Sequence, residues 1–440
     1  MHAALPAGPR APRAAQMAAW LARPLWFASQ CRARYGDTFT VKIEQRPWVM
    51  LSDPAAIREV FTAPADLMHA GDANEILRPM LGPSSVLLLD GAAHMHQRKL
   101  MLPAFHGERL QRYREIMVDA TERALADWRP GDALALRPHA QAITLEVIVR
   151  AVFGVEAGAA NDRLKALLSH VLDRLTRVRR MVVIAAAGPN HPRIVALFRR
   201  ELAAVDAELY RLIAERRAAS DLADRDDVLS MLLLARDERG AGLSDSELRD
   251  ELMTLLVAGH ETTANSLAWA FERLARTPGG LERVAEDAGY AEAAVRETLR
   301  LRPVIALVAR RLTRDAEIAG RLLPEGAVLT PCILLVHRRA DIYPDPDAFR
   351  PERFLERPPG TYTWIPFGGG RRRCLGASFA LLEMRIVLRT VLERTEVGAT
   401  GALERTRRRN ITISPGSGAR TVLRRRQASQ RRPEPATQAA

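Results

Sequence analysis

Residues 367–376 organise the rest of the chain, and they read Phe367-Gly368-Gly369-Gly370-Arg371-Arg372-Arg373-Cys374-Leu375-Gly376. Three consecutive glycines permit backbone angles that other residues avoid, and they let a flat ligand come close to the main chain. An apolar helix is predicted to begin near Leu375. Cys374 then lies where the loop becomes a helix, so unpaired N–H groups and the helix dipole are expected to lower its pKa. The segment therefore predicts a loop that presents a thiolate to a metal.

Cys374 on its own has a simpler interpretation, because an isolated cysteine in an intracellular protein is usually a small buried apolar residue. Its neighbours argue against that interpretation. Zinc would require further ligands at short spacing, and no Cys-x-x-Cys or histidine pair lies nearby. A phosphate-binding loop would carry Lys and then Ser or Thr after its last glycine, where this loop carries arginine and cysteine. Neither zinc nor phosphate accounts for the segment.

The segment resembles the haem-binding loop of the cytochrome P450 family, in which Phe, Gly, Arg, Cys and Gly stand at fixed spacing. All five positions are matched, at Phe367, Gly370, Arg372, Cys374 and Gly376. The resemblance implies that Cys374 is the axial ligand of a haem b iron, and that its sulfur favours cleavage of dioxygen. It also implies that Phe367 packs beside the sulfur, that Gly368 and Gly376 are haem-binding positions, and that Arg372 pairs with a haem propionate.

Composition and length bound the domain organisation. With 440 residues and no internal linker rich in Pro, Gly and Ser, the chain is expected to form one large domain over residues 25–423. Residues 1–24 are a proline-rich lead-in, and residues 424–440 are a basic tail that we expect to be disordered. The three cysteines are too few and too dispersed for a disulfide framework, which suits a reducing cytoplasm.

Neither a membrane span nor nucleic-acid binding is predicted. Prolines at positions 6, 9, 12 and 24 interrupt the N-terminal residues, so no run reaches the ~20 apolar residues of a transmembrane helix. The formal net charge is +13, but the arginines are scattered among acidic residues without interleaved aromatic residues. We therefore expect a cytoplasmic protein whose excess positive charge serves an acidic partner.

Hydrophobic periodicity predicts a mainly helical chain with small sheets. After a short helix that begins at residue 53, helices are expected over residues 113–128, 141–153, 161–177, 192–218 and 227–235. Strands are expected at residues 39–43, 48–51, 317–323 and 327–335, and in a closing hairpin of residues 411–416 with 419–423. Residues 67–89 lack a clean period and predict a long irregular loop, which in a compact domain is usually functional or disordered.

Three residues outside the glycine-rich segment are candidates for binding haem propionates. His94 and Arg98 share one face of a predicted helix at i, i+4, which alone would indicate a solvated face. The family places a His or Trp and, four residues later, a basic residue against a propionate, so the resemblance implies this role for His94 and Arg98. Arg310 lies five residues before Asp315, which is the spacing of another propionate-binding arginine of the family.

The longest predicted helix spans residues 244–276 and begins with a capping box formed by Ser244 and Glu247. Its centre is nearly all apolar, so burying Glu261 and Thr262 there costs free energy unless they are bonded or used. Alone, Glu261 could equally reach the surface. Residues 258–263 match the oxygen-activation segment of the family. The resemblance implies that Ala258 and Gly259 leave space over the haem, that Thr262 donates a hydrogen bond to dioxygen, and that Glu261 relays protons.

Glu297 and Arg300 form an acid–base pair at i, i+3 on a helix predicted over residues 292–301. At a surface such a pair contributes only tenths of a kcal/mol. In the family, this Glu-x-x-Arg pair joins the arginine of a Pro-Glu-Arg-Phe segment, which is Arg353 within residues 351–354 here. The resemblance implies that Glu297, Arg300 and Arg353 together lock the loop that holds the haem.

The substrate cavity is expected to be apolar. Residues 181–189 are an apolar segment, and in the family the helices around such a segment cover the cavity, which implies a lipophilic substrate. The candidate cavity residues are Ser85, Val86, Ala258, Val304, Ile305 and Ile411.

The resemblance implies the cytochrome P450 fold, a single triangular haem domain that is mainly α with small β-sheets. It implies insertion of one oxygen atom from O2 into a lipophilic small molecule of the fatty acid, terpene, steroid or polyketide type. Electrons are expected from a ferredoxin or flavodoxin with its reductase. Two alternatives stay open, a peroxide-dependent peroxygenase and a haem protein that binds ligands without turnover. Glu261 and Thr262 weigh against both.

Overall fold

The structure is a computed structural model, and it describes residues 3–425 apart from 108, 130, 132, 176–182, 185–186 and 410. The helices are α1 (Arg13–Ala22), α2 (Pro24–Tyr35), α3 (Pro54–Thr62), α4 (Arg78–Leu81), α5 (Gly91–Met101), α6 (Arg109–Leu125), α7 (Leu136–Ala151), α8 (Ala159–Leu175), α10 (Pro192–Ala218), α11 (Val228–Leu234), α12 (Asp245–Leu274), α13 (Gly280–Glu286), α14 (Ala288–Leu301), α15 (Ile333–Val336), α16 (Arg353–Glu356) and α17 (Ala377–Arg394). Short 3-10 turns are η1 (Asp72–Leu77), η2 (Leu102–Phe105), η3 (Leu222–Asp224) and η4 (Gly370–Arg372).

The strands are short and belong to four sheets. They are β1 (Thr38–Val41), β2 (Trp48–Leu51), β3 (Met68–His69), β4 (Ala133–Ala135), β5 (Arg310–Leu312), β6 (Ala316–Ile318), β7 (Arg321–Leu323), β8 (Val328–Pro331), β9 (Thr395–Ala399), β10 (Thr406–Arg409), β11 (Thr412–Pro415) and β12 (Arg420–Arg425). The prediction of a mainly helical chain with small sheets is confirmed.

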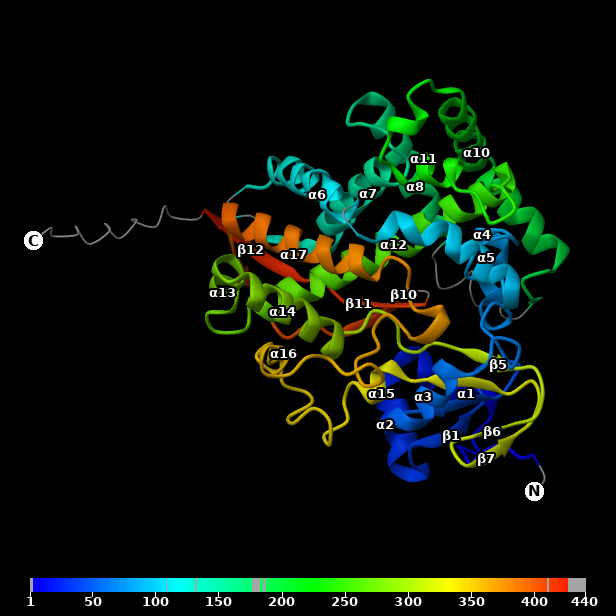
Figure 1. The fold of residues 1–440 in the computed structure, drawn as a ribbon. Helices are drawn as coiled ribbons and strands as arrows, with labels where there is room; N and C mark the ends of the chain where they lie inside the picture. The colour runs from blue at the N-terminus through cyan, green and yellow to red at the C-terminus, as the bar shows by residue number, and fades with distance from the viewer. Residues whose placement is uncertain are drawn as a thin grey trace, which may run out of the picture.

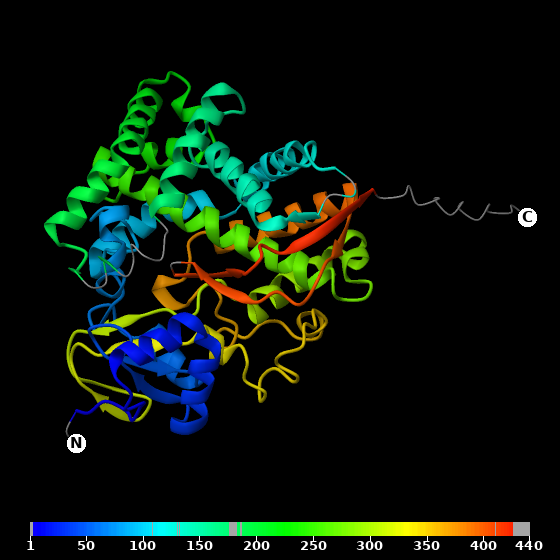
Figure 2. The ribbon, with the colours of Figure 1, turned by 180° about the vertical axis from the view of Figure 1, so that it is seen from behind.

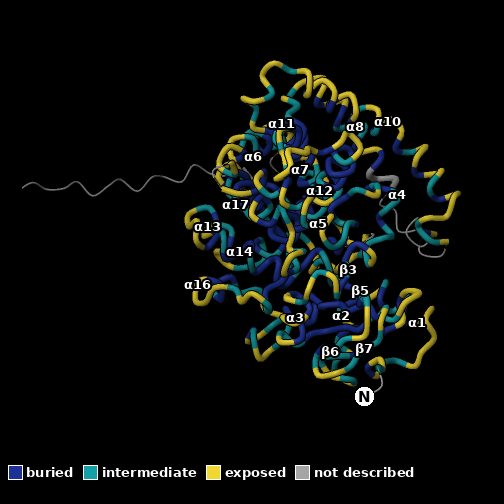
Figure 3. The backbone as a smooth tube through the Cα atoms, turned by 45° about the vertical axis from the view of Figure 1, so that its right-hand side comes forward, coloured by how far each residue is buried: buried dark blue, intermediate teal, exposed yellow. Residues whose placement is uncertain are grey.

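Helix α12 forms the centre of the larger, helical part of the molecule (Figure 1). It packs against α7, α10, α14, α17 and strand β11, so most of its length is buried. The predicted capping box is present, because Ser244 accepts from the Glu247 N–H and the Glu247 carboxylate accepts from the Ser244 N–H. Figure 3 shows the buried backbone concentrated around this helix, with exposed residues on the outer helices. The middle of α12 therefore lies in the core.

The smaller part of the molecule holds the N-terminal helices and a five-stranded sheet in the order β1-β2-β8-β5-β3 (Figures 1 and 2). The predicted hairpin is confirmed, since β1 and β2 pair antiparallel with Thr38 opposite Leu51. Strand β8 joins β2 in parallel, and β5 pairs antiparallel with both β8 and β3. Because Arg310 begins β5, the sheet places this arginine close to the segment that contains β3.

Several predicted segments differ from the structure. The strand expected over residues 327–335 ends at Pro331 and is followed by helix α15, and residues 317–323 form the two strands β6 and β7. Residues 67–89 contain β3, η1 and α4 rather than one irregular loop, because η1 and α4 are too short to produce a readable period. The expected closing hairpin is also wrong. Strand β11 pairs with β10, whereas β12 pairs with β4 and β9. The chain changes sheets between them through Gly418 and Ala419, both of which have positive φ.

Several elements also begin or end at residues other than those predicted. Helix α10 begins and ends as predicted, but α6 and α7 begin four and five residues before the predicted starts at 113 and 141. Helices α1 and α2 were not predicted, and α1 lies within the proline-rich lead-in. Strand β12 continues to Arg425, and the rest of the predicted tail lies outside the described residues, as do parts of the 161–177 helix and of the apolar segment 181–189.

Within the part of the chain that the structure describes, every helix is too short or too polar to cross a membrane.

Candidate functional site

The glycine-rich loop has a compact fold that ends at Cys374. The chain forms the turn η4, and Gly376 then caps α17, two residues beyond the predicted helix start. The Cys374 N–H donates to the Phe367 carbonyl over 3.0 Å, which closes the loop on itself. The Phe367 ring lies edge-on to Trp364, with 6.0 Å between the ring centroids. The loop therefore holds the sulfur in one position relative to α17.

The three consecutive glycines are required by a protein contact. Gly368 and Gly370 have φ values of 66° and 62°, which favour glycine. A Cβ atom on Gly369 would collide with the Phe61 ring of α3, and one on Gly370 would collide with the Phe61 backbone. A Cβ on Gly376, by contrast, would meet no protein atom within 4 Å. At Gly369 and Gly370, helix α3 comes as close to the loop backbone as we expected the flat ligand to come. At Gly376 the loop backbone is open to a ligand.

Burial dominates the acid–base behaviour of the Cys374 thiol. Cys374 is solvent-accessible, but the surrounding protein desolvates its thiol, and this desolvation raises the pKa of the thiol. The Gly376 N–H, Arg98 and Arg373 lower the pKa by less. The predicted lowering of the pKa is therefore wrong for the protein alone. A metal ion deprotonates a thiol that coordinates it, so the donor remains suited to iron.

More cationic side chains than protein carboxylates lie beside this loop. Burial is the largest cause of a lowered pKa for His94, Arg98, Arg310 and Arg372, and each also lies near another cation of this group or of the loop. The pKa of His94 falls to about 3, so its imidazole is neutral. Among the described residues, Arg98 and Arg310 form no salt bridge with a carboxylate, and Arg372 pairs with Asp90. The group fits a ligand that carries two carboxylates, which is the chemistry of the haem propionates.

Arg372 has protein partners that the sequence did not predict. Its guanidinium donates to the carboxylate of Asp90, to the Leu89 carbonyl and, over 3.0 Å, to the Val86 carbonyl. Asp90 was not among the predicted site residues. Its spacing from the loop in the sequence gives no signal, because 282 positions separate the two partners.

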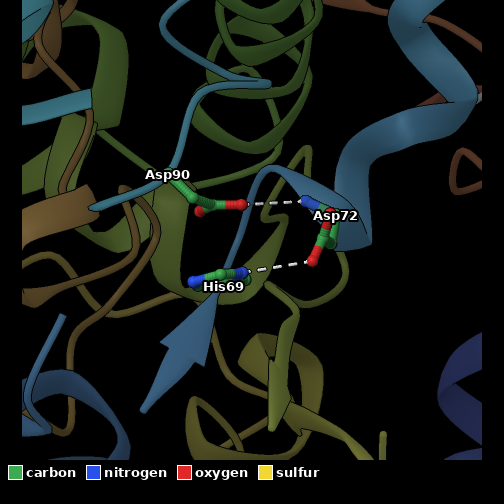
Figure 4. Close-up of side chains that lie close together, drawn as sticks. All are labelled: His69, Asp72 and Asp90. Atoms are coloured by element: carbon green, nitrogen blue, oxygen red, sulfur yellow. Dashed lines mark hydrogen bonds and ion pairs between the residues drawn. The ribbon is translucent and has the colours of Figure 1, made fainter. Parts of the chain in front are cut away.

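His69, Asp72 and Asp90 lie close enough together to resemble a metal-binding cluster (Figure 4). The His69 Nδ1 atom lies 3.2 Å from an Asp72 carboxylate oxygen. Arg311 pairs with Asp72, however, and Arg372 pairs with Asp90. Both carboxylates already have a cationic partner, so we assign no metal to this cluster.

The centre of α12 carries the predicted acid–threonine pair. The Thr262 hydroxyl donates to the Ala258 carbonyl over 2.6 Å, which fixes its orientation within the helix. Ala258 is exposed although its helix runs through the core, so it faces an internal space. Gly259 serves a different contact from the one expected, because a Cβ there would come within 3.0 Å of the Ile148 side chain of α7. Gly259 therefore allows α7 to approach α12.

Glu261 points toward a polar network on the other side of α12. Its carboxylate lies 3.4 Å from the Arg137 guanidinium and accepts from the Thr412 hydroxyl over 3.2 Å. Arg137 also donates to the Asn265 side chain over 2.8 Å. Burial and the Arg137 charge lower the pKa of the neighbouring His260 to about 4, so that ring is neutral. Glu261 is consequently bonded rather than free at the surface, which answers the question that the sequence left open.

The predicted lock is fully buried. The Arg300 guanidinium makes two hydrogen bonds to the Glu297 carboxylate, of 2.7 and 2.8 Å, and Arg353 makes one of 3.1 Å. The two arginines also donate to backbone carbonyls of residues 337–348. The sequence did not single out His337, which extends the lock to the glycine-rich loop. It donates from Nδ1 to the Arg300 carbonyl and accepts at Nε2 from the Ile365 N–H.

The candidate cavity residues divide into two groups along α12. Val304 and Ile305 lie beside β11, since the Ile413 N–H donates to the Val304 carbonyl and Ile305 bridges to Thr412. Ile411 next to them is exposed. Ser85 differs from the expectation, because it is fully buried and its hydroxyl is bonded to the Thr254 hydroxyl at 2.7 Å. Ser85 thus attaches its segment to α12 and has no hydroxyl available for a substrate.

A single accessible thiol, a cationic group suited to two carboxylates and a central acid–threonine pair define a protein of the haem-thiolate class. The family described as "Cytochrome P450" matches residues 6–408. Cytochrome P450 135B1 of Mycobacterium tuberculosis is 42% identical over 436 residues, which cover 96% of this chain and 91% of that protein. Cytochrome P450 135A1 of the same organism is 38% identical over 432 residues, which cover 95% of each chain.

Solved structures agree on the fold. The structure titled "Retinoic acid bound cyanobacterial CYP120A1" superposes with a TM-score of 0.83 at 25% identity and covers 96% of this chain and 100% of that chain. The haem domain of cytochrome P450DA superposes with a TM-score of 0.84 at 21% identity, over 96% and 98% of the two chains. This chain belongs to the cytochrome P450 family. It is a monooxygenase, an oxidoreductase that uses haem iron, dioxygen, a substrate and electrons from a redox partner.

Proposed function

We propose that this chain holds haem b through Cys374 and inserts one oxygen atom from dioxygen into a lipophilic small molecule. The observation that carries the proposal is that Cys374, just before α17, and Ala258, in the middle of the mostly buried helix α12, are both solvent-accessible. When bound, the haem supplies the redox chemistry that activates dioxygen. Arg98 and Arg310, with the neutral His94, are the residues that would hold the propionates.

The protein's own part in the reaction is to deliver protons and exclude competing water. The single hydrogen of the Thr262 hydroxyl goes to the Ala258 carbonyl in this structure, so the hydroxyl would turn from that carbonyl to donate a hydrogen bond to dioxygen. Glu261 would resupply the proton, because its carboxylate is held by Arg137 and Thr412 at the edge of the same helix. The acid–threonine pair supports a monooxygenase over a peroxygenase or a non-catalytic binder, since neither of those needs proton delivery to dioxygen.

A lipophilic substrate is supported by the apolar residues of the segments that pair beside α12. Val304 and Ile305 pair through backbone groups with Ile413 and Thr412 of β11, which follow Ile411, and the hydroxyl of Ser85 is bonded within the protein. The cyanobacterial structure that resembles this fold is described as bound to retinoic acid, which is a lipophilic acid. We propose a substrate of the fatty acid, terpene, steroid or polyketide type.

The electron donor is proposed to be an acidic protein, a ferredoxin or flavodoxin with its reductase. Arg371 and Arg373 are exposed on either side of the half-buried Arg372. They stand next to Cys374 in the chain, so a donor bound there would have a short path to the metal.

The assignment of Cys374 can be tested by its spectroscopic signature. Cys374→Ser protein should lose the ferrous–carbonyl absorption of a thiolate-ligated haem, whether or not it retains haem. A matched Cys332→Ser variant changes a buried cysteine that is remote in sequence from the loop and should keep that absorption. An unchanged spectrum in Cys374→Ser protein would contradict the assignment. Chemotypes that shift the iron spin state of the unaltered protein would then define the substrate class.

A further inference from the structure

Asp90 occupies an unusual position at the start of α5. Aspartate at an N-cap usually accepts hydrogen bonds from its own helix, but the Asp90 side chain caps none of the α5 N–H groups. It turns instead toward residues 70–72 and accepts from three consecutive backbone N–H groups, those of Ala70 at 2.8 Å, Gly71 at 2.9 Å and Asp72 at 3.1 Å. Figure 4 shows the last of these bonds. These three bonds hold the Asp90 carboxylate in place independently of its contact with the glycine-rich loop.

The same carboxylate meets the guanidinium of Arg372. One terminal nitrogen of Arg372 donates to Asp90 and to the Leu89 carbonyl, and the other donates to the Val86 carbonyl. The pair is mostly buried, with 14% of the Arg372 side chain and 15% of the Asp90 side chain exposed. Both terminal nitrogens of Arg372 are therefore engaged by residues 86–90.

Segment 84–90 is held on its other side by α12. The Ser84 N–H donates to Asp250 over 2.9 Å, and the Val86 N–H donates to Glu251 over 2.7 Å. The Arg372–Asp90 pair consequently connects the Cys374 loop, through one short segment, to the central helix.

Arg98 and Arg310 stand in contrast to Arg372. Arg310 is only 7% exposed, and the one hydrogen bond of its side chain among the described residues goes to the Ala309 carbonyl next to it. Neither arginine has a salt bridge with a carboxylate in the described part of the chain. Asp90 lies near enough to raise the pKa of Arg310 but forms no ion pair with it. A buried guanidinium without a paired anion is unfavourable, so Arg310 fits an added anion, and the half-buried Arg98 also lacks a paired carboxylate among the described residues. Arg372 differs because it is already paired with Asp90.

We propose that Asp90 is a positioning residue for the Cys374 loop, which it holds through its ion pair with Arg372. This inference rests on the haem site proposed above and adds a carboxylate that lies outside the glycine-rich loop.

A double-mutant cycle on the haem-loaded protein tests the pairing. The variants are Asp90→Asn, Arg372→Gln and their combination, and the readouts are thermal unfolding and the rate of haem loss to excess apomyoglobin. Each single change should speed haem loss on the order of tenfold, because charge-assisted hydrogen bonds are lost. The double variant should lose haem no more than about threefold faster than the worse single variant, since both changes remove one interaction. The effect of Arg98→Gln should multiply with that of Asp90→Asn, because the charges that act on Arg98 are those of Cys374 and Arg373.

The proposal is overturned if Asp90→Asn protein loses haem at the unaltered rate, or if the Asp90 and Arg372 effects multiply. Asp72→Asn is the matched control, since Asp72 lies in the same cluster but pairs with Arg311. It should change haem loss by less than about threefold. Should Asp90→Asn fail to fold, Asp90→Glu keeps the charge but displaces it by one methylene.

The ferrous–carbonyl spectrum separates positioning from general stability. A displaced loop should convert part of the Asp90→Glu or Asp90→Asn protein from the thiolate absorption to that of a protonated thiol, with a larger share after Asn. A uniform thiolate spectrum in both would contradict the positioning role. Loss of the thiolate absorption in Cys374→Ser protein tests the haem site independently, so the two proposals can fail separately.

Discussion

At the scale of single residues, the same physical effect sets several properties of the site. Desolvation raises the pKa of the Cys374 thiol and lowers the pKa of the His94 imidazole to about 3, because both lose the water that stabilises their charged forms. The neutral state of each then depends on burial, which no local sequence pattern encodes. The hydroxyl of Thr262 differs, since its 2.6 Å bond to Ala258 is made within one helix turn. Its orientation follows from its position in α12.

Thr262→Ala protein should bind substrate and accept electrons but divert most of them to peroxide or water. Removing a positioned proton donor lowers the productive rate on the order of 10², which is the usual scale of general acid–base assistance. The measurement is the ratio of product formed to reductant consumed. Thr262→Ser keeps the hydroxyl and should retain most of the coupling. Equal coupling in the alanine and unaltered proteins would remove Thr262 from the proton pathway.

Glu251 should make the stability of the protein depend on pH. Burial raises the pKa of its carboxyl from an ordinary 4.5 to about 8. Between these values the folded protein holds a proton that the unfolded chain has released, so stability falls as pH rises through this window. Glu251→Gln protein has no carboxyl group that titrates at this position, and its amide oxygen can still accept from the Val86 N–H. It should gain stability relative to the unaltered protein between pH 5 and pH 9, by on the order of a few kcal/mol.

Thermal unfolding of the two proteins at each pH gives this difference. Comparing them cancels the contribution of His94, His260 and His337, whose pKa values burial lowers to between about 3 and 4. Those histidines make stability fall toward acid pH, in the opposite direction. A difference that stays constant with pH would show that Glu251 titrates normally.

At the scale of elements, helix α14 depends on one buried carboxylate. Glu297 accepts from two arginines and from the Arg350 N–H, and those arginines bind the backbone of residues 337–348. His337 carries the connection on to Ile365, two residues before Phe367. The helix, the extended segment and the glycine-rich loop therefore share a single polar network.

Glu297→Ala should prevent haem incorporation and stable folding, because it leaves two buried guanidinium groups without their anion. Breaking a buried ion pair in this way costs about 3–5 kcal/mol. Glu292→Ala on the same helix is the control, since that side chain is 38% exposed and forms surface pairs that contribute at most about 1 kcal/mol. Expression with haem content and thermal unfolding compares them. A well-folded, haem-replete Glu297→Ala protein would refute the role of the lock.

At the scale of the whole molecule, the net charge of +13 favours association with an acidic partner. The exposed Arg371 and Arg373 belong to the loop that carries Cys374, so the docking face we propose is the one nearest the proposed metal ligand. Steering by such charges raises the association rate and weakens with salt, as the Debye length falls to about 8 Å at physiological ionic strength.

Reduction by a ferredoxin or flavodoxin should slow on Arg371→Glu or Arg373→Glu and on addition of salt, with haem content unchanged. Reversing one interfacial charge typically acts on the association rate, and an effect of about tenfold at low salt is expected. Arg200→Glu makes the same charge change on α10, which packs against α4, α8, α11 and α12, and should have little effect. If neither the loop variants nor added salt changed the rate of reduction, the electron donor would have to dock on another face.

The sequence by itself determined the elements and residues whose signals are local. Local neighbours within one or two helix turns account for the turn of the glycine-rich loop into α17, the capping box of α12, the limits of α10 and the spacing of Glu297 and Arg300. Such features depend on backbone geometry and helical periodicity, which short stretches of sequence encode directly.

Only the tertiary structure decided the pairings between distant segments. It placed β12 beside β4 and β9 instead of β11, attached Ser85 to Thr254, and joined Arg372 to Asp90 across 282 positions. It also reversed the expected shift in the Cys374 pKa. In each case the outcome depends on which groups share a buried volume and lose water together, and that volume exists only once the chain has folded.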